Sequence, residues 1–471
     1  MSFVFYDTET TGINTSFDQI LQFAAIRTDA ELNEIDRFEV RSRILPSVLA
    51  SPHALKLTGV RAAQLVDPDI PSHYEMMHQI QERLVDWSPA LFLGYNSIEF
   101  DEHLLRHSLY KTLHLPYLTN TNGNSRSDVM RMVQATHLFC PDALTIPRGA
   151  NGKFSFKLDQ VAPANGFDHA NAHDALADVE ATIFLCQLVA ERAPAIWSSF
   201  MRFSRKASVA DHLVAEPIFC FSDFYFGKPF SCLATGLGPA TSSDARFYIF
   251  DLAVDPDDLM CMNNEKLVKR LAASPKPVRS VRCNASPMLM SAEDAPAFVS
   301  ARVLDDDELQ RRMERLRDDA QFCERLIGLM EQSKKEDAVS PYAEEQLYDG
   351  FFPDGDQELL AQFHDAAWEH RPVIVARLED PRLRQLGLQL IHAERPDVLE
   401  DRERLHLDHL VASRLMSDGN KLPWLTAHKA NEEFESLIVD AAHAERDFLL
   451  EHLALARDRI HQAKQILSNA V

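Results

Sequence analysis

Residues 3–12 read Phe-Val-Phe-Tyr-Asp-Thr-Glu-Thr-Thr-Gly, an apolar stretch that runs into two carboxylates and then into a turn. The aromatic and apolar residues predict a β-strand, and the closing Thr-Thr-Gly predicts its end. Because side chains alternate between the two faces of a strand, Asp7 and Glu9 leave the same face as Phe3 and Phe5. Paired carboxylates repel each other unless a cation lies between them, and oxygen ligands favour Mg²⁺ or Mn²⁺. The alternative reading is a solvated pair of acids at a strand end.

The residues that follow predict the rest of one α/β domain. Further strands are expected at 20–26, 38–45 and 90–95, and helical spacing of apolar residues covers 72–87 and 98–110. Strands followed by alternating strands and helices favour a single α/β domain over residues 1–193.

Two more domains are expected beyond it. Residues 194–340 predict a small β-barrel or β-sandwich domain with helical insertions, including one charged helix over 309–332. Its short β-like runs are separated by Gly, Pro, Asp and Asn and lie at 217–225, 231–234, 247–252 and 278–283. Residues 345–471 predict an all-α domain that ends in one long helix over 431–468.

The composition restricts the partners and the compartment. The 471 residues contain 48 Lys and Arg against 71 Asp and Glu, a net charge of −23, so bulk charge cannot hold a nucleic acid. The seven Cys are scattered without a Cys-x-x-Cys pair, which favours a reduced, cytoplasmic protein. No apolar run reaches the roughly 18–20 residues that span a bilayer, and the first residues lack the pattern of a secretory signal. No membrane association is expected.

Basic residues nevertheless gather in three runs without intervening acids. One run of this kind is usually a solvated surface, but three in an acidic chain favour a track for the phosphates of a single strand. The same runs could instead serve a protein partner, and the sequence does not assign which run does which. The longest acid-free stretch covers 266–292, and the candidate track residues in it are Lys266, Lys269, Arg270 and Arg279. The other two runs are Arg192, Arg202, Arg205 and Lys206, and Arg148, Lys153 and Lys157.

Two motifs supply further acids and a base. Gly94-Tyr95-Asn96 follows a predicted strand and places Asp101 in the first turn of the next helix. His173 precedes a later helix that has Asp178 in its first turn. Each has a plain alternative: Asp101 as a partner of the helix dipole, and Asp174 as a helix cap beside an exposed Asp178.

Together these residues indicate a chemistry. The carboxylates of Asp7, Glu9, Asp101 and Asp178 suit the hydrolysis of a phosphodiester by two metal ions. The imidazole of His173, with an ordinary pKa of about 6.5, can accept a proton from water at neutral pH.

The sequence resembles the DEDDh exonucleases and, over its whole length, the bacterial exonuclease I family. The first motif alone matches many proofreading and RNA-trimming enzymes, whereas the run at 22–29 and the long part after residue 193 narrow the resemblance to exonuclease I. The matching segments are Asp7 to Gly12, Gln22 to Asp29, Leu57-Thr58-Gly59, Gly94-Tyr95-Asn96, Phe100-Asp101, Asp128 to Arg131, and Ala164-Asn165-Gly166 leading to His173 and Asp178.

The resemblance implies a ribonuclease-H-like exonuclease domain, an SH3-like β-barrel domain and a helical C-terminal domain that enclose a groove for single-stranded DNA. It implies processive 3′→5′ removal of 5′-mononucleotides in DNA repair and recombination, with two Mg²⁺ ions for which Mn²⁺ substitutes. Asp7, Glu9, Asp101 and Asp178 would then be metal ligands and His173 the general base.

The resemblance also implies substrate contacts and partners. Glu9, Thr10, Leu57 and Asn96 fall in motifs that line the pocket for the terminal nucleotide, and Arg148 is a further candidate contact. Thr8 stands where close relatives can carry an aromatic residue. Single-stranded DNA and the acidic C-terminal tail of single-stranded DNA-binding protein are the expected partners, and a monomer is the expected state.

Two other functions stay open at this stage. A DEDDh exoribonuclease that trims RNA 3′ ends would have the same nuclease domain, although simple RNA trimmers lack a long C-terminal part. A non-catalytic nucleic-acid-binding scaffold could keep the fold, but would have no need for two divalent ions.

Overall fold

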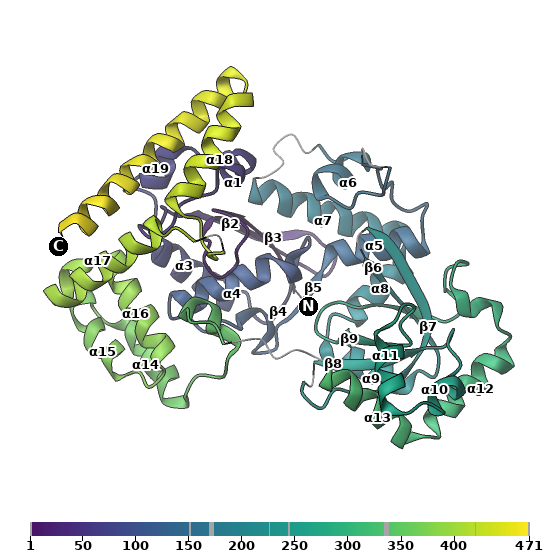
Figure 1. The fold of residues 1–471 in the computed structure, drawn as a ribbon. Helices are drawn as coiled ribbons and strands as arrows, with labels where there is room; N and C mark the ends of the chain where they lie inside the picture. The colour runs from purple at the N-terminus through teal and green to yellow at the C-terminus, as the bar shows by residue number, and fades with distance from the viewer. Residues whose placement is uncertain are drawn as a thin grey trace.

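The computed structural model describes residues 2–149, 152–168, 174–225, 227–243, 245–333, 339–419 and 421–469, without the side chains of Ser300 and Arg302. The N-terminal part lies in the middle of the molecule, with the central segment on one side and the C-terminal helices on the other (Figure 1). Among the described residues, no helix is both long enough and apolar enough to cross a membrane.

The N-terminal part is built on a five-stranded mixed sheet in the order β3-β2-β1-β4-β5. β1 lies at its centre, antiparallel to β2 and parallel to β4, with Asp7 opposite Ala24 and Glu9 opposite Gln22. The predicted strands at 3–9 and 20–26 are confirmed, and the one expected at 38–45 begins and ends earlier. The strands are β1 (Ser2–Thr10), β2 (Ile20–Thr28), β3 (Glu34–Arg41), β4 (Ala90–Gly94) and β5 (Ser125–Asp128).

Helices cover both faces of this sheet, as the alternation along β1 requires. Phe3 and Phe5 share a buried cluster with α5, α7 and α8, whereas Val4 and Tyr6 pack against α3 and α4. Asp7 and Glu9 therefore continue the α7 face, and Thr8 continues the α4 face. The helices of this part are α1 (Pro52–Thr58), α2 (Ala62–Val66), α3 (His73–Asp86), α4 (Asp101–Lys111), α5 (Val129–Phe139), α6 (Leu158–Ala164) and α7 (Ala175–Arg192), followed by α8 (Pro194–Arg202).

The ends of these helices follow local capping chemistry. Ser72 and Glu75 form a reciprocal capping box with hydrogen bonds of 3.1 and 2.7 Å, which begins α3 where the sequence predicts it. α4 begins at Asp101 rather than at Ile98, because a short 3₁₀ turn over Ser97–Glu99 comes first. Asp101 therefore does stand in the first turn, as predicted.

The central segment forms a five-stranded antiparallel sheet in the order β10-β6-β7-β8-β9. Long strand β7 pairs with β6 through one half and with β8 through the other, and its register shifts between Gly236 and Gly238. A Cβ at Gly236 would overlap the carbonyl oxygen of Leu213 in α9, so the close packing of this helix requires glycine. The strands are β6 (Phe219–Tyr225), β7 (Lys228–Pro239), β8 (Arg246–Asp251), β9 (Val278–Arg282) and β10 (Met288–Ser291).

Helices pack around this sheet, and one expectation for them is wrong. The helix predicted over 309–332 is two helices, because Asp318 ends the first and the Asp319 carboxylate caps the second by accepting from Phe322 N at 3.0 Å. Hydrophobic periodicity continues through this break, so spacing alone misses it. The helices of this segment are α9 (Lys206–Ala215), α10 (Pro256–Met260), α11 (Asn264–Ala272), α12 (Asp306–Arg317) and α13 (Ala320–Gln332).

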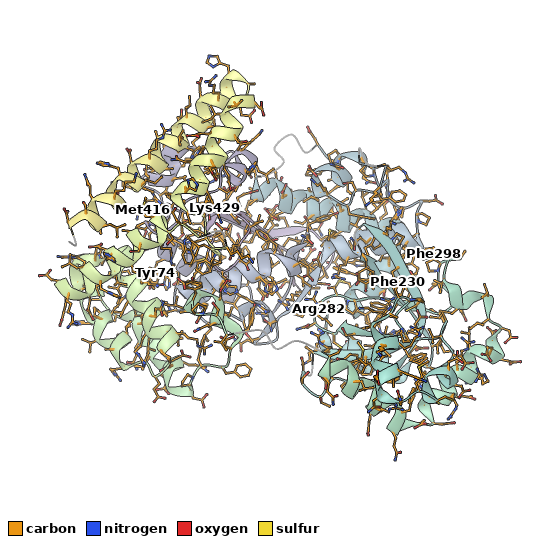
Figure 2. The ribbon with its side chains drawn as sticks, in the orientation of Figure 1. Tyr74, Phe230, Arg282, Phe298, Met416 and Lys429 are labelled. Carbon is orange, nitrogen blue, oxygen red and sulfur yellow. The ribbon has the colours of Figure 1, made fainter. Side chains whose placement is uncertain are left out.

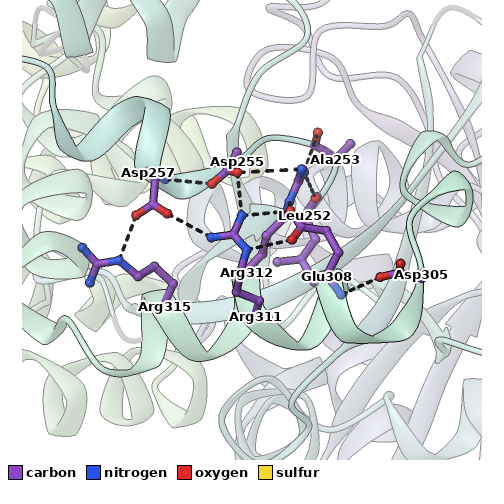
Figure 3. A network of polar contacts seen from close by, with 9 residues as sticks. All are labelled: Leu252, Ala253, Asp255, Asp257, Asp305, Glu308, Arg311, Arg312 and Arg315. Carbon is purple, nitrogen blue, oxygen red and sulfur yellow. Dashed lines mark hydrogen bonds and ion pairs between the residues drawn. The ribbon is translucent and has the colours of Figure 1, made fainter.

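Charged side chains fasten α12 to the start of α10 (Figure 3). Arg311 contacts the carboxylates of Asp255 at 2.6 Å and Asp257 at 2.9 Å, and Arg315 contacts Asp257 at 2.8 Å. Arg312 donates to the carbonyl oxygen of Leu252 at 2.9 Å. The high charge of α12 therefore serves local packing within the central segment.

The C-terminal segment is helical, as predicted, but the expected single helix over 431–468 is wrong. α18 ends at Asp440, Ala441 is extended, and α19 begins at His443. This helical pair returns to the N-terminal part, where Phe434 and Leu449 share a buried cluster with Leu55 of α1 (Figure 1). The helices are α14 (Asp354–Asp365), α15 (Arg371–Arg377), α16 (Pro381–Glu394), α17 (Asp401–Met416), α18 (Ala427–Asp440) and α19 (His443–Asn469).

Candidate active site

Three of the predicted carboxylates lie together at the end of β1. One carboxylate oxygen from each of Asp7, Glu9 and Asp178 lies within 4.8 Å of the others, which is a spacing that can hold a metal ion. Asp7 and Glu9 come from the strand, and Asp178 comes from the first turn of α7. Asp7 and Glu9 thus share one face of β1, as expected, and that face lies against α7, which carries Asp178.

The fourth carboxylate, Asp101, approaches from the other side of β1. Its Oδ1 accepts a 2.5 Å hydrogen bond from the hydroxyl of Thr8, whose side chain faces α4. Asp101 is 5% exposed and lies close enough to raise the pKa of Asp7. β1 therefore supplies two carboxylates on one face and a partner for a third on the other.

The carboxylates strongly perturb one another. Burial, with Asp101, Asp178 and Glu9 nearby, raises the pKa of Asp7 well above its usual range. Burial and the neighbouring Asp178 raise the pKa of Glu9 to about 9, and burial raises the pKa of Asp101 to about 7. A divalent cation among these oxygens would stabilise their charged forms, so the donor set fits a hard cation such as Mg²⁺.

A residue before α7 fixes the position of Asp178. Asp174 caps the helix, with Oδ1 accepting from Leu176 N at 3.2 Å, so its capping role is confirmed. Its Oδ2 accepts from Arg41 at 3.0 Å and from Gln22 at 3.1 Å. Asp178, one turn later, is half-buried beside Asp7 and Glu9 rather than exposed.

Arg41 and Gln22 are site residues whose role sequence reasoning misses. Gln22 lies opposite Glu9 in the pairing of β1 and β2, so its place follows only once that register is known. Arg41 ends β3, and nothing in its own sequence neighbourhood marks it. His173, the predicted base, lies outside the described residues.

The candidate substrate contacts lie on several elements. Thr10 is buried, and its hydroxyl donates to the Gly12 carbonyl oxygen at 2.7 Å. Leu57 is 55% exposed on α1, and Asn96 is exposed with a left-handed φ of 59°, while its N–H donates to Asp128 at 2.9 Å. Arg148 lies over the Phe154 ring, 4.0 Å from its centroid.

The candidate track residues separate into two places. Lys266 and Lys269 are exposed on α11, where Lys269 pairs with Glu265 at 2.8 Å. Arg270, on the same helix, donates to the Pro275 carbonyl oxygen at 2.7 Å. Arg279 lies on β9, with its guanidinium 3.6 Å from the centroid of the Phe230 ring.

The sheet that carries Arg279 adjoins the N-terminal part. Arg282, at the end of β9, forms an ion pair with Glu99 just before α4. Figure 2 labels both Phe230 and Arg282 in the central segment. Arg279 therefore lies on a strand that contacts the N-terminal part directly.

Comparisons with known proteins match both ends of the chain. A family model described as exonuclease matches residues 4–185, and one described as the exonuclease I C-terminal domain matches residues 342–455. Exodeoxyribonuclease I of Escherichia coli is 26% identical over 402 residues, which cover 82% of this chain and 84% of that protein. Exodeoxyribonuclease I of Haemophilus influenzae is 27% identical over 406 residues, with the same coverage.

Solved structures agree in fold over nearly the whole length. Exonuclease I from Methylocaldum szegediense has a TM-score of 0.83 at 26% identity and covers 98% of this chain and 99% of its own. E. coli exonuclease I in complex with a dA16 oligonucleotide also has a TM-score of 0.83, at 23% identity, with 97% and 99% covered.

Proposed function

This chain belongs to the exonuclease I family, and from that premise we propose that it removes nucleotides from the 3′ end of single-stranded DNA by metal-dependent hydrolysis. The observation that carries the proposal is the meeting of Asp7, Glu9 and Asp178 within 4.8 Å, with Asp101 buried beside them. A site that only stabilised the fold would have no use for four such carboxylates, because burial and mutual repulsion oppose their charged forms.

We propose that these four residues hold two Mg²⁺ ions, for which Mn²⁺ substitutes. When bound, the ions would supply an activated water and charge stabilisation for the leaving oxygen. The protein's own part is to fix the carboxylates: Asp174 and Arg41 set the start of α7, and Thr8 orients Asp101. His173 is proposed to accept the proton of the attacking water.

The pocket for the terminal nucleotide is proposed to include Glu9, Thr10, Leu57 and Asn96, with Arg148 as a further contact. The exposed side chains of Leu57 and Asn96 support this, since each can reach a ligand at the surface. The stacked guanidinium of Arg148 presents a cation beside an aromatic ring, which suits a nucleic acid.

A track for the strand is proposed along Lys266, Lys269, Arg270 and Arg279. The pairing of Arg279 with the Phe230 ring supports DNA contact at that residue, because rings and guanidinium groups both stack on bases. Lys266 and Lys269 of α11 are the better candidates for the acidic C-terminal tail of single-stranded DNA-binding protein, because they are exposed on a helix outside the sheet.

We propose three domains over 1–193, 194–340 and 345–471, with the central one an SH3-like barrel. The strand order and strand β7 support the barrel. β7 pairs with β6 and with β8 and has a register shift within it, and such an irregularity bends a strand so that the sheet can curve. A monomer that acts in the cytoplasm in DNA repair and recombination completes the proposal.

Two alternatives have less support. An RNA-trimming exonuclease would not need the exonuclease I C-terminal domain that matches residues 342–455. A non-catalytic scaffold would not need to keep the carboxylates of Asp7, Glu9 and Asp178 together with Asp101 beside them.

A time course on 5′-labelled single-stranded DNA, matched duplex and matched RNA, in Mg²⁺ or EDTA, tests the proposal. The wild type should produce a ladder that shortens from the 3′ end on single-stranded DNA only, and only with Mg²⁺. Asp178→Asn and His173→Ala should abolish it, whereas Asp401→Asn, a change of a carboxylate whose side chain is 84% exposed, should not. Preferential loss of RNA would favour the exoribonuclease, and no loss of any substrate would favour the scaffold.

A further inference from the structure

A second group of potential metal ligands lies where the exonuclease part meets the C-terminal helices. His78 of α3, His114 just after α4 and His364 of α14 each offer a ring nitrogen within 4.8 Å of the other two. Tyr74, labelled in Figure 2, lies at the same junction and contacts His364 Nδ1 through its hydroxyl at 3.0 Å. The proposed nuclease chemistry uses none of these residues.

Hydrogen bonds fix the tautomers of two of the rings. His114 Nδ1 lies 3.0 Å from the hydroxyl of Thr112, which already donates its proton to the Ser108 carbonyl oxygen at 2.7 Å. Nδ1 of His114 must therefore carry the hydrogen. His364 Nε2 lies 3.0 Å from the Leu113 carbonyl oxygen, which can only accept. The free lone pairs of these two rings are therefore on His114 Nε2 and His364 Nδ1, and both nitrogens face the other rings of the cluster.

The third ring completes the arrangement. His78 Nε2 faces the Glu82 carboxylate at 3.5 Å, and its Nδ1 lies 3.3 Å from His114 Nε2. His78 Nδ1 and His114 Nε2 share a hydrogen bond at this distance. When the proton of His78 is on Nε2, towards Glu82, an ion can take the place of that shared hydrogen, because about 3.3–3.4 Å separates two nitrogens bound tetrahedrally to one Zn²⁺. Each ring thus has an oxygen acceptor on its far nitrogen, as metal-bound histidines do.

The charge state of the rings also suits a cation. Burial, with His364 and His78 nearby, holds the pKa of His114 well below its usual range, and burial lowers the pKa of His364 to about 4. Both are neutral at pH 7 and keep their lone pairs. The guanidinium of Arg371, which stacks on Trp368 at 3.8 Å, is positively charged and would repel a bound cation. The acids Glu82 and Asp365 line the same cavity and offset it.

The cavity beside the rings has a volume of about 600 Å³, which leaves room for a water as a further ligand. Binding requires two local changes. The Tyr74 hydroxyl must leave His364 Nδ1, and the rings of His114 and His364, stacked at 3.9 Å between centroids, must move apart. Both are side-chain motions at the edge of a cavity.

We propose that His78, His114 and His364 bind one Zn²⁺ or a similar transition-metal ion, which joins α14 to α3 and to the end of α4. Imidazole nitrogens favour such ions, whereas Mg²⁺ favours the carboxylates of the candidate active site, so the two sites differ in metal preference. The ion would cross-link the C-terminal helices to the exonuclease part.

Co²⁺ is the probe for the test, because its visible absorption reports nitrogen ligands and tetrahedral geometry. The full chain carries Asp7→Asn and is kept in excess Mg²⁺, so that the carboxylate site does not contribute. His78→Ala is the main variant, since its side chain is 38% exposed and its loss leaves the rings of His114 and His364 in place. His428→Ala is the matched control, because His428 also faces a glutamate four residues later, at 3.3 Å, and its side chain is 69% exposed.

The background protein and its His428→Ala form should bind one Co²⁺ per chain with a tetrahedral spectrum, and Zn²⁺ should displace it and raise the melting temperature. His78→Ala should lose the spectrum and the thermal shift. Glu82→Gln should weaken binding by about 10–100-fold, the usual effect of removing an outer partner of a metal ligand. Tyr74→Phe should retain the ion. No tetrahedral spectrum in the background protein, or an unchanged one in His78→Ala, would overturn the proposal.

Discussion

The hydroxyl of Thr8 donates a 2.5 Å hydrogen bond to the carboxylate of Asp101, although 93 residues separate them. Thr8 stands between Asp7 and Glu9 in the sequence but faces the opposite side of β1. A short strand therefore both presents two candidate metal ligands and orients a third. An aromatic residue at this position would have to orient Asp101 in another way.

Thr8→Val should keep the shape of the side chain and remove the bond to Asp101. We expect kcat on single-stranded DNA to fall by about 10–100-fold, and the free energy of unfolding to fall by about 1–3 kcal/mol because a buried acceptor loses its donor. Steady-state kinetics and urea denaturation measure these changes. Thr8→Ser should restore both, and DNA affinity in EDTA should not change. Wild-type kcat in Thr8→Val would contradict the role given to the hydroxyl.

The metal-free protein should lose stability as the pH rises. Glu9 has its pKa raised from an ordinary 4.5 to about 9, so the folded state binds more protons than the unfolded state between these values. Stability from this group is complete below about pH 4.5 and declines up to about pH 9. Thermal denaturation in EDTA against pH measures the decline. Glu9→Gln should flatten the curve, as should saturating Mg²⁺, and an equal slope in all three samples would refute the assignment.

Gly236→Ala should destabilise the central segment, because the new Cβ would meet the Leu213 carbonyl oxygen of α9. The expected loss is about 1–3 kcal/mol, as for other overpacked sites. Gly328→Ala is the matched control: it lies inside α13 with open space around it, and alanine should raise stability there by up to about 1 kcal/mol. Urea midpoints of the two variants should therefore move in opposite directions.

Neutralising Lys266, Lys269, Arg270 and Arg279 should shorten the run of nucleotides removed per encounter. The salt dependence of single-strand binding should also fall, by about 0.7 in log–log slope for each phosphate that the protein no longer neutralises. Arg279→Gln alone should produce most of the effect on DNA if the α11 residues serve a protein partner. Lys464→Gln on α19 is the control, and unchanged processivity in the fourfold variant would exclude these residues from the track.

The sequence predicts the parts of the site that depend on short-range periodicity. The common face of Asp7 and Glu9 follows from strand alternation, and the positions of Asp101 and Asp178 follow from helix starts. Spacing misses the breaks at Asp318 and Ala441, because the apolar pattern of each helix continues into the next.

Contacts between distant segments are not predictable from local patterns. The bond of Arg41 to Asp174 depends on how β3 and α7 pack, and the meeting of His78, His114 and His364 depends on the docking of α14. Each of these residues lies in an ordinary local sequence, so only the tertiary fold gives it a partner.

The return of α18 and α19 to α1 bears on how the chain folds during synthesis. Leu55 and Leu65 are synthesised several hundred residues before Phe434 and Leu449, with which they share a buried cluster. At typical elongation rates the interval is on the order of tens of seconds. During that interval the nascent exonuclease part exposes this apolar surface, which chaperones can bind until α18 and α19 are made.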